Sequence, residues 1–155
     1  MNVAENLVAL LKAQGLVCAT AESCTGGGVG SAITAVPGSS AVFAGGVISY
    51  ANEVKRDVLG VAAQALDEYG AVSPQVAAQM AEGARKLLKV DLAVSLTGIA
   101  GPDGGSEEKP VGLVWFGLAT KDGVRTEKAI FRGDRAKVRE QAVTHALGML
   151  TIAAT

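Results

Sequence analysis

Histidine, cysteine and aromatic residues are all scarce in this chain of 155 residues. It has one histidine and two cysteines, and aromatic side chains make up only 4% of it. Cys18 and Cys24 do not have the spacing of zinc ligands. With a single histidine in the chain, they cannot supply the usual set of metal ligands. Two cysteines also form no disulfide framework. We therefore expect no metal, and reduced thiols in a cytoplasmic protein.

Positive charge in excess and long apolar runs are missing as well. The formal net charge is -1, which gives no basic field for a nucleic-acid backbone or an anionic membrane. No apolar run is long enough to cross a bilayer, and residues 1–14, which include Glu5 and Gln14, lack the pattern of a signal peptide. We expect neither nucleic acid nor a membrane as a partner.

Small aliphatic residues and glycine are plentiful instead. Hydrophobic residues make up 49% of the chain, which has 20 glycines, and the length suits a single domain over residues 1–155. Helices and strands alternate early and a hairpin follows late, which predicts a three-layer α/β/α sandwich with a mixed sheet. The patterns predict helices near 3–14, 25–35, 52–59, 73–88 and from 134 onward, and strands near 16–21, 41–50, 91–96, 111–120 and 124–131.

Three helices carry more detailed expectations. Asn52 is expected to cap the short third helix, and Ser73 followed by Pro74 is a strong helix start. Helical spacing predicts that the helix after Ser73 buries Val76, Met80, Ala84 and Leu87, and that the last helix has an apolar stripe of Val138, Ala142, His145, Met149 and Ile152. We interpret His145 as a packed or interface histidine, and the stripe would suit a homo-oligomer interface.

The stretch AESCTGGG, residues 21–28, follows a predicted strand and precedes a predicted helix. Glycines at such a place let backbone N–H groups face an anion, either a phosphate or the oxyanion of an acyl transfer. The alternative is a tight turn that allows close packing of helix and sheet. If the stretch holds a nucleophile, it is Ser23, Cys24 or Thr25.

Known cofactor motifs do not fit this stretch. No Gly-Lys dipeptide exists, so there is no P-loop, and the glycine spacing misses the dinucleotide pattern at its third small residue. We expect no cofactor. A serine nucleophile needs a base, and a lysine with a lowered pKa can serve where histidine is lacking. Lys55 is the candidate, because a helix start and the adjacent charge of Arg56 would both disfavour its ammonium.

A second glycine-rich segment runs from Thr97 to Gly112. A loop of this length in a compact domain is usually functional or disordered, and repeated glycine favours a shaped binding loop. Asp103 could accept ribose hydroxyls while backbone N–H groups hold a phosphate. Ser106 and Lys109 match the S-x-x-K pattern of penicillin-recognising enzymes, but we expect a loop there rather than the helix start that pattern needs, with Lys109 free to bind a ligand anion.

Four segments carry a resemblance to a known family. AESCTGG, SYANEVK, GAVS and SLTGIAGPDGGSEEKPVGLVWFGLA are similar to the C-terminal domain family of competence/damage-inducible protein CinA, over essentially the whole chain. The resemblance implies hydrolysis of the carboxamide of nicotinamide mononucleotide to nicotinic acid mononucleotide and ammonia, in pyridine nucleotide recycling. Longer family members have a second, molybdopterin-binding-like domain, whose pyrophosphatase activity we do not expect from this chain.

The resemblance also implies roles for individual residues. Ser23 would be the nucleophile, Lys55 the base, and Tyr50 a helper in proton transfer. The small-molecule nucleotide would be held by the oxyanion turn, the second loop and one basic residue of the last helix, namely Thr25, Gly26, Gly27, Thr97, Gly98, Ala100, Gly101, Asp103, Gly104, Gly105 and Arg139. Two alternatives stay open: a non-catalytic nucleotide-binding or regulatory module, and a thiol enzyme that uses Cys24.

Overall fold

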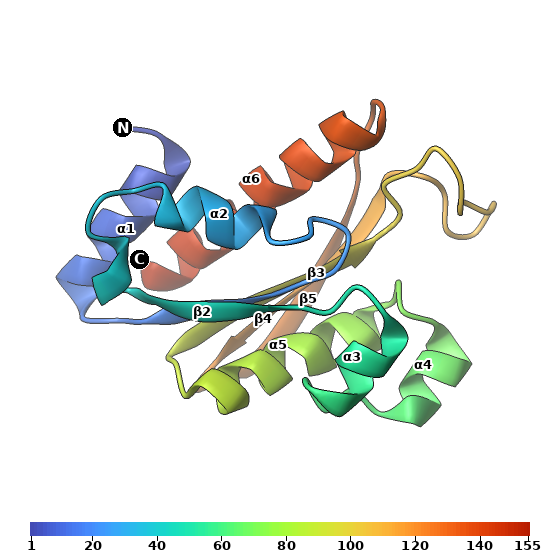
Figure 1. Ribbon diagram of the computed structural model, residues 1–155, viewed down its shortest axis with the longest axis horizontal. Coiled ribbons are helices and arrows are strands. Elements are labelled where there is room, and N and C mark those ends of the chain that lie inside the picture. Colours follow the sequence, from blue (N-terminus) through green and yellow to red (C-terminus); the bar gives the residue numbers. More distant parts are fainter.

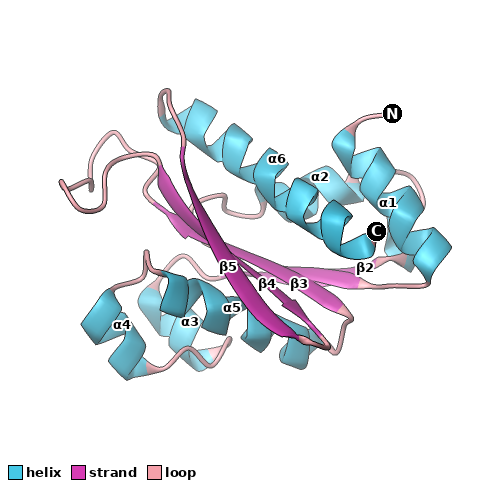
Figure 2. Ribbon diagram, turned by 180° about the vertical axis from the view of Figure 1, so that it is seen from behind, coloured by secondary structure: helices cyan, strands magenta, loops and turns pink.

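The computed structural model describes residues 1–155 and has three layers, as the sequence predicts. A central five-stranded sheet is covered on one face by helices α1, α2 and α6 and on the other by α3, α4 and α5 (Figure 1). The view from behind shows the same division, with α6 lying along one face and α5 along the other (Figure 2). The α/β/α sandwich is therefore confirmed.

The elements follow one another in the order expected from the sequence, with one further α-helix and a short 3₁₀ helix. The helices are α1 (Val3–Gln14), α2 (Gly28–Thr34), α3 (Asn52–Asp57), α4 (Ala63–Tyr69), α5 (Pro74–Leu88) and α6 (Arg135–Ala154), with a short 3₁₀ helix η1 at Ser39–Ala41. The strands are β1 (Cys18–Glu22), β2 (Phe43–Ile48), β3 (Leu92–Gly98), β4 (Leu113–Thr120) and β5 (Gly123–Ile130). Helix α4 is the addition: its two short turns bury mainly Ala65, too little for a clear apolar period.

Side chains cap three of the six α-helices. Asn2 accepts a hydrogen bond from the Glu5 N–H, Ser73 from the Val76 N–H and Asp134 from the Lys137 N–H. The prediction for Asn52 is wrong, because Ala51 stands at the cap and Asn52 is the first helical residue. No side chain caps this helix.

The sheet has the order β2-β1-β3-β4-β5 and is mixed. Strand β1 pairs in parallel with both β2 and β3, whereas β4 is antiparallel to β3 and β5. The chain leaves β1 toward β2 through α2 on one face, and leaves β2 toward β3 through α3, α4 and α5 on the other face (Figure 1). The carboxyl end of β1 is therefore a topological switch point, where α/β sheets usually bind ligands.

Two apolar clusters fill the space on either side of the sheet. The larger has 23 buried residues, mainly from α1, α2, α6 and the sheet, and the smaller has 10, around α5. Val76, Met80 and Ala84 of α5 are buried as predicted, but Leu87 is exposed. Ile152 of α6 is exposed too: Leu150 and Ala154 on either side of it are buried, so Ile152 lies on the outer face of the helix.

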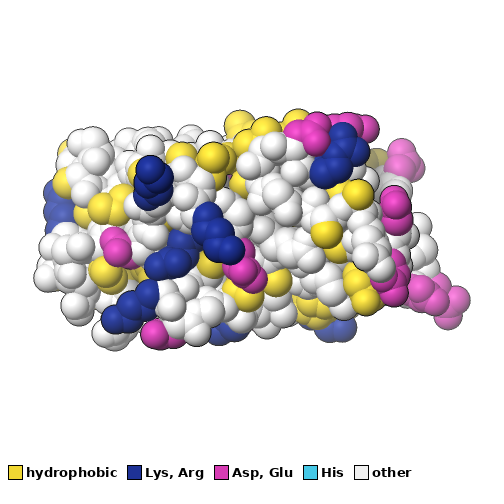
Figure 3. Space-filling view, turned by 90° about the horizontal axis from the view of Figure 1, so that it is seen from below, with side chains coloured by type: hydrophobic (Ala, Val, Ile, Leu, Met, Phe, Trp, Pro, Cys, Tyr) yellow, Lys and Arg dark blue, Asp and Glu magenta, His cyan; other side chains and the backbone are white.

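No helix is both long and apolar enough to cross a membrane. The face covered by α3, α4 and α5 carries charges of both signs, with acidic side chains gathered at one end of it (Figure 3). Exposed acidic residues at that end of the molecule belong to α4 and to the long loop before β4, namely Asp67, Glu68, Asp103, Glu107 and Glu108.

Candidate active site

Ser23 and Lys55 meet at the carboxyl end of the parallel strands. Ser23 is the first residue after β1, and its N–H donates to the Leu96 carbonyl of β3 at 3.1 Å. Lys55 lies in α3, which follows the neighbouring strand β2. Its Nζ is 3.0 Å from Ser23 Oγ, although 32 residues separate the two in sequence. Parallel pairing of β1 with β2 places both segments at the same edge of the sheet.

Burial gives this lysine unusual properties. Lys55 is only 1% exposed and Ser23 only 8%. Loss of solvation lowers the pKa of the Lys55 amine below the usual lysine value of 10.5, although a Cys24 thiolate would raise it. Arg56, which we expected to lower this pKa by repulsion, is exposed and pairs with Asp57 at 2.8 Å. The direction of the predicted shift agrees with the structure, but its main cause is burial.

Two backbone carbonyls complete the surroundings of the Lys55 amine. Nζ lies 2.6 Å from the Ser49 carbonyl and 3.3 Å from the Tyr50 carbonyl. A neutral amine has two N–H donors and one lone pair. If the two N–H groups donate to the two carbonyls, the lone pair remains for the Ser23 hydroxyl proton. The geometry thus provides what a serine nucleophile with a lysine base needs.

A cleft of about 200 Å³ opens beside this pair. It lies between the ends of β1, β2 and β3, the segment before α5 and the first turn of α6. Its lining consists of Ser23, Cys24, Tyr50, Asn52, Lys55, Ala71, Val72, Thr97, Gly98, Ala100 and Arg135. The sequence-predicted residues Ser23, Lys55, Tyr50, Thr97, Gly98 and Ala100 are therefore brought together in one place.

Tyr50 and Arg135 face each other across the mouth of the cleft. Tyr50 is 63% exposed, and its hydroxyl accepts a hydrogen bond from Arg135 Nη2 at 3.3 Å. Arg135 Nη1 also donates to the Gly101 carbonyl at 2.9 Å. Tyr50 reaches Lys55 only through its backbone carbonyl, not through its phenol. Arg135 is the cationic side chain of the mouth, whereas our sequence-based choice was Arg139.

Arg139 lies outside the cleft lining. Its Nε donates to the Cys24 carbonyl and its Nη2 to the Thr25 carbonyl, both at 3.1 Å. The two arginines are one helical turn apart on α6, so the sequence alone does not separate them.

The glycine-rich turn after Ser23 differs from our expectation. Gly26 and Gly27 have φ values of 60° and 102°, so they form the turn itself, and a side chain on Gly28 would collide with Val143 of α6. None of the three lines the cleft. The alternative of a tight turn with close packing therefore explains these glycines better than the approach of a ligand.

The amino end of α2 is occupied by the protein's own carboxylate. Glu22 is buried, and its oxygens accept hydrogen bonds from the N–H groups of Val29 and Gly30, at 2.9 and 3.0 Å, and from the Thr25 hydroxyl at 2.7 Å. The Thr20 hydroxyl lies 3.2 Å from the same carboxylate. These N–H groups are thus unavailable to a substrate anion, and Glu22 is a residue that our sequence analysis did not single out.

The long loop between β3 and β4 contributes only its first part to the site. Gly101 reaches Arg135, but Asp103, Gly104 and Gly105 are exposed and do not line the cleft. Ser106 and Lys109 lie in a turn of the loop, as predicted. Lys109 Nζ donates to the Tyr69 carbonyl at 2.6 Å, so it ties the loop to α4 instead of facing the cleft.

Several cleft residues were not predicted individually. Asn52, Ala71, Val72 and Arg135 line the cleft without any local signal of chemistry, although SYANEVK and GAVS, which include three of them, contributed to the family resemblance. Ala71 is held in place because its carbonyl accepts a hydrogen bond from the Thr97 hydroxyl at 3.0 Å. A search for residues next to strand ends in space would have found them, but that requires the tertiary structure.

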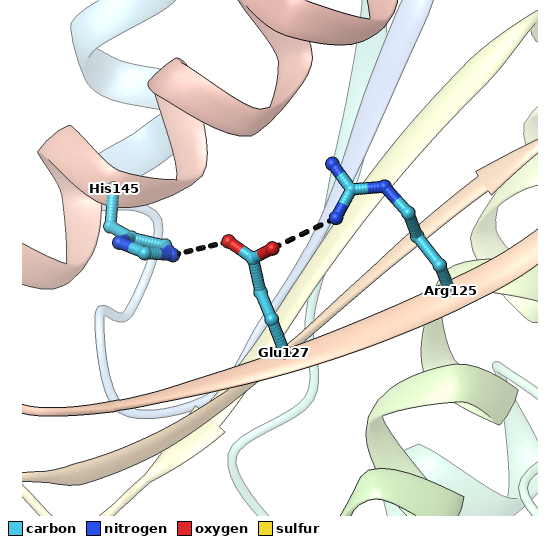
Figure 4. A network of polar contacts seen from close by, with 3 residues as sticks. All are labelled: Arg125, Glu127 and His145. Carbon is cyan, nitrogen blue, oxygen red and sulfur yellow. Dashed lines mark hydrogen bonds and ion pairs between the residues drawn. The ribbon is translucent and has the colours of Figure 1, made fainter.

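Cys24 and His145 do not have the properties of catalytic groups. Burial raises the pKa of the Cys24 thiol to about 11, so little thiolate exists near neutral pH. His145 packs on Phe116, with ring centroids 4.3 Å apart, and its Nε2 pairs with Glu127 at 2.7 Å (Figure 4). It is a packed histidine, as one of our interpretations had it. The His145 side of α6 contacts the sheet of the same chain.

A mixed α/β/α domain with a buried serine and lysine side by side at the switch point has the layout of a serine hydrolase that uses a lysine base. Comparison with known sequences then places the chain in a family. The CinA C-terminal domain family matches residues 1–153, and the chain belongs to it.

Characterised and solved relatives agree with this assignment. The chain is 51% identical over 151 residues to "Nicotinamide-nucleotide amidohydrolase PncC" of Escherichia coli K12, covering 97% of this chain and 92% of that protein. It is 57% identical over 131 residues to a "Putative competence-damage inducible protein" of Halothermothrix orenii, of which it spans only 32%. The crystal structure of competence/damage inducible protein CihA from Agrobacterium tumefaciens is 44% identical, with a TM-score of 0.94, and covers 98% of this chain and 93% of that one.

Proposed function

We propose that this protein hydrolyses the carboxamide of nicotinamide mononucleotide to nicotinic acid mononucleotide and ammonia, in pyridine nucleotide recycling. The observation that carries the proposal is the buried Ser23–Lys55 contact at 3.0 Å, in a chain half identical to an Escherichia coli nicotinamide-nucleotide amidohydrolase over nearly the whole length of both. Reduced thiols at Cys18 and Cys24 fit action in the cytoplasm.

In the first half of the proposed reaction, Ser23 Oγ adds to the amide carbon while the neutral Lys55 amine accepts the hydroxyl proton. The N–H groups of Cys24 and Thr25 are the donors for the resulting oxyanion, because neither makes a hydrogen bond within the chain. The Gly26 N–H, in contrast, already donates to the Ser23 carbonyl at 3.1 Å. The tetrahedral intermediate then expels ammonia, which takes its proton from the Lys55 ammonium and leaves an ester on Ser23.

In the second half, water attacks this ester. Lys55 accepts a proton from the water and returns it to Ser23 Oγ as the carboxylic acid departs, so both residues recover their starting state. One water is consumed and one ammonia released for each turnover. Tyr50, whose hydroxyl binds Arg135 and not Lys55, acts in this scheme as a wall of the cleft mouth and not in proton transfer.

The substrate is held in two parts. The cleft of about 200 Å³ is small for a whole nucleotide, since complete ligand pockets usually measure about 300–1,000 Å³. The pyridine ring and carboxamide occupy the cleft between Val72, Thr97 and Ala100, and the ribose phosphate extends to the mouth. Arg135 is the cation there, and its planar guanidinium can bind two phosphate oxygens at once. Arg139, Asp103, Gly104 and Gly105 are left without a direct substrate contact in this arrangement.

Release of ammonia from nicotinamide mononucleotide tests the proposal. The wild-type protein is expected to produce one ammonia per nicotinic acid mononucleotide, and Ser23→Ala and Lys55→Met are each expected to lose at least about 10³-fold in kcat. Ser106→Ala is a matched control, because Ser106 is an exposed serine of the long loop away from the cleft. Ammonia release by Ser23→Ala at the wild-type rate would refute the proposed nucleophile.

The alternative is a nucleotide-binding or regulatory module without turnover. It predicts that the wild-type protein binds nicotinamide mononucleotide, measured by calorimetry, yet releases no more ammonia than Ser23→Ala. The Ser23–Lys55 geometry favours the enzyme, because burial of a lysine next to a serine is costly and has no purpose in simple binding.

A further inference from the structure

Arg139 binds the backbone of the turn that follows Ser23. It lies on α6, far away in sequence, and two of its nitrogens donate to two successive carbonyls, those of Cys24 and Thr25, each at 3.1 Å. Its side chain is not part of the cleft lining. An arginine fork that binds two adjacent carbonyls fixes the orientation of two consecutive peptide groups.

The orientation of these peptide groups determines where their N–H groups point. In a planar trans peptide, the carbonyl of one residue and the N–H of the next are antiparallel. When Arg139 holds the Cys24 carbonyl, the Thr25 N–H must therefore point away from Arg139. The next peptide, which joins Thr25 to Gly26, is fixed twice, since the Gly26 N–H also donates to the Ser23 carbonyl.

The Thr25 N–H is a buried donor with no partner. Thr25 is 1% exposed and its hydroxyl is engaged with Glu22, but its N–H and that of Cys24 make no hydrogen bond within the chain. Unpaired buried N–H groups are rare in folded proteins, because each one costs free energy. Two such groups next to a buried serine indicate donors reserved for an anion formed during reaction.

Glu22 secures the same turn from its other side. One oxygen of its carboxylate binds both the Thr25 hydroxyl and the Val29 N–H, at 2.7 and 2.9 Å, and so links the turn to the start of α2. Arg139 and Glu22 thus hold the backbone and the side chain of Thr25 from different directions. Rotation of the peptide between Cys24 and Thr25 would break a contact on either side.

We infer that Arg139 is a positioning residue: it keeps the N–H group of Thr25 directed at the oxyanion, with Glu22 as the opposing anchor, and it does not contact the substrate. This inference rests on the proposed amidohydrolase function, whose nucleophile is Ser23. It departs from our sequence-based expectation that Arg139 holds the ribose phosphate. The two roles predict different kinetic effects and can be separated.

The first test compares Arg139→Gln, Arg139→Lys and Lys137→Gln as intact chains acting on nicotinamide mononucleotide. Loss of transition-state donors lowers kcat, so Arg139→Gln is expected to lose about 10- to 100-fold in kcat with KM within about threefold of wild type. Arg139→Lys retains the charge but lacks the planar fork that holds both carbonyls. Its kcat should therefore lie between those of Arg139→Gln and the wild type. Lys137→Gln removes an equal charge from the same helix without touching the turn, and should match wild type. A rise in KM with unchanged kcat for Arg139→Gln would overturn the inference.

The second test does not depend on the natural substrate. Phenylmethanesulfonyl fluoride sulfonylates an activated serine, forming an O–S bond at Ser23 and releasing fluoride and a proton, and its transition state also carries charge on oxygen. Mass spectrometry should show that Arg139→Gln and Glu22→Gln slow this labelling about 10-fold or more, with Lys137→Gln labelled at the wild-type rate. Equal labelling rates in wild type and Arg139→Gln would refute the inference. If wild type released no ammonia but the labelling rates differed as expected, the proposed function would fail while the inference stood.

Discussion

Lys55 Nζ lies 3.0 Å from Ser23 Oγ in a part of the protein that excludes nearly all solvent from both side chains. The lysine sits in a six-residue helix, too short to be stable alone, and is held by the carbonyls of Ser49 and Tyr50. Burial thus does two things: it fixes the distance between the two groups, and it favours the uncharged amine that can accept a proton.

The pH dependence of ammonia release should report this amine. Only neutral Lys55 can accept the Ser23 proton, and burial lowers the pKa of Lys55 below 10.5. The rate is therefore expected to be low where Lys55 is charged and to rise with pH, with the midpoint of the kcat/KM profile below 10.5. Lys55→Arg keeps a permanent charge and should lose about 10²- to 10⁴-fold at every pH. If the pH profile of kcat/KM for the wild type had its midpoint at the ordinary lysine pKa of 10.5, the role of burial would be contradicted.

Cys24 should be dispensable as a nucleophile. Because burial raises the pKa of its thiol to about 11, iodoacetamide at neutral pH should label it slowly. We expect Cys24→Ala to keep kcat/KM within about threefold of wild type. The counterpart Cys18, whose thiol pKa is raised to about 12 by burial, lies in β1 and serves as an internal reference for the labelling rate. Loss of activity in Cys24→Ala together with retention in Ser23→Ala would establish the thiol enzyme instead.

Arg135 should determine affinity for the phosphate. Its guanidinium stands at the mouth of the cleft, so Arg135→Gln is expected to raise KM for nicotinamide mononucleotide about 10- to 100-fold, with a much smaller effect on kcat. Nicotinamide riboside, which lacks the phosphate, provides the control substrate. Wild type and Arg135→Gln should have the same kcat/KM for nicotinamide riboside. An equal loss of kcat/KM on both substrates would show that Arg135 acts only by holding Gly101 and Tyr50.

The contact between Glu127 and His145 predicts a small pH-dependent stabilisation. Burial alone would raise the pKa of Glu127, but hydrogen bonds from Arg125 and His145 outweigh it and hold that pKa below 4.5 (Figure 4). The contribution is complete at pH values above 4.5 and is lost as the pH falls through the lowered pKa. Because the carboxylate is partly exposed, Glu127→Gln should cost only about 0.5 kcal/mol at neutral pH. Thermal unfolding should show this difference at neutral pH and a smaller one in acid; a larger difference in acid would have the wrong sign.

Two residues of α5 should differ sharply in their effect on stability. Met80 is fully buried beneath the sheet, so Met80→Ala is expected to cost about 2–5 kcal/mol. Leu87, which helical spacing also placed in the core, is exposed, and Leu87→Ala should change stability by about 0.5 kcal/mol or less. Urea unfolding of the two variants measures both values. A cost above about 2 kcal/mol for Leu87→Ala would indicate that its surface is covered by another molecule in solution.

Local sequence signals predicted those parts of the fold that depend on near neighbours. Ser73 and Asp134 cap helices because each side chain binds an N–H three residues ahead. The Thr120–Gly123 pair closes a two-residue hairpin, with Lys121 and Asp122 at the turn, as the glycine there indicated. Helix α4 was missed because it buries so little that its residues show no clear period.

The candidate active site also combines features that the sequence indicates with features that only the tertiary structure shows. Sequence alone indicated an α/β fold, a buried strand before Ser23, and a lysine in place of histidine if the serine reacts, since His145 is the only histidine. Tertiary structure decided which arginine enters the cleft and which binds the turn, because Arg135 and Arg139 lie one turn apart on the same helix.

Tertiary structure also decided the role of the glycines and the lowered pKa of Lys55. Gly26 and Gly27 serve a left-handed turn, Glu22 fills the amino end of α2, and Lys55 is buried by segments from three strand ends. Burial, hydrogen-bond partners and the direction of a peptide group depend on residues distant in sequence, and no local pattern encodes them.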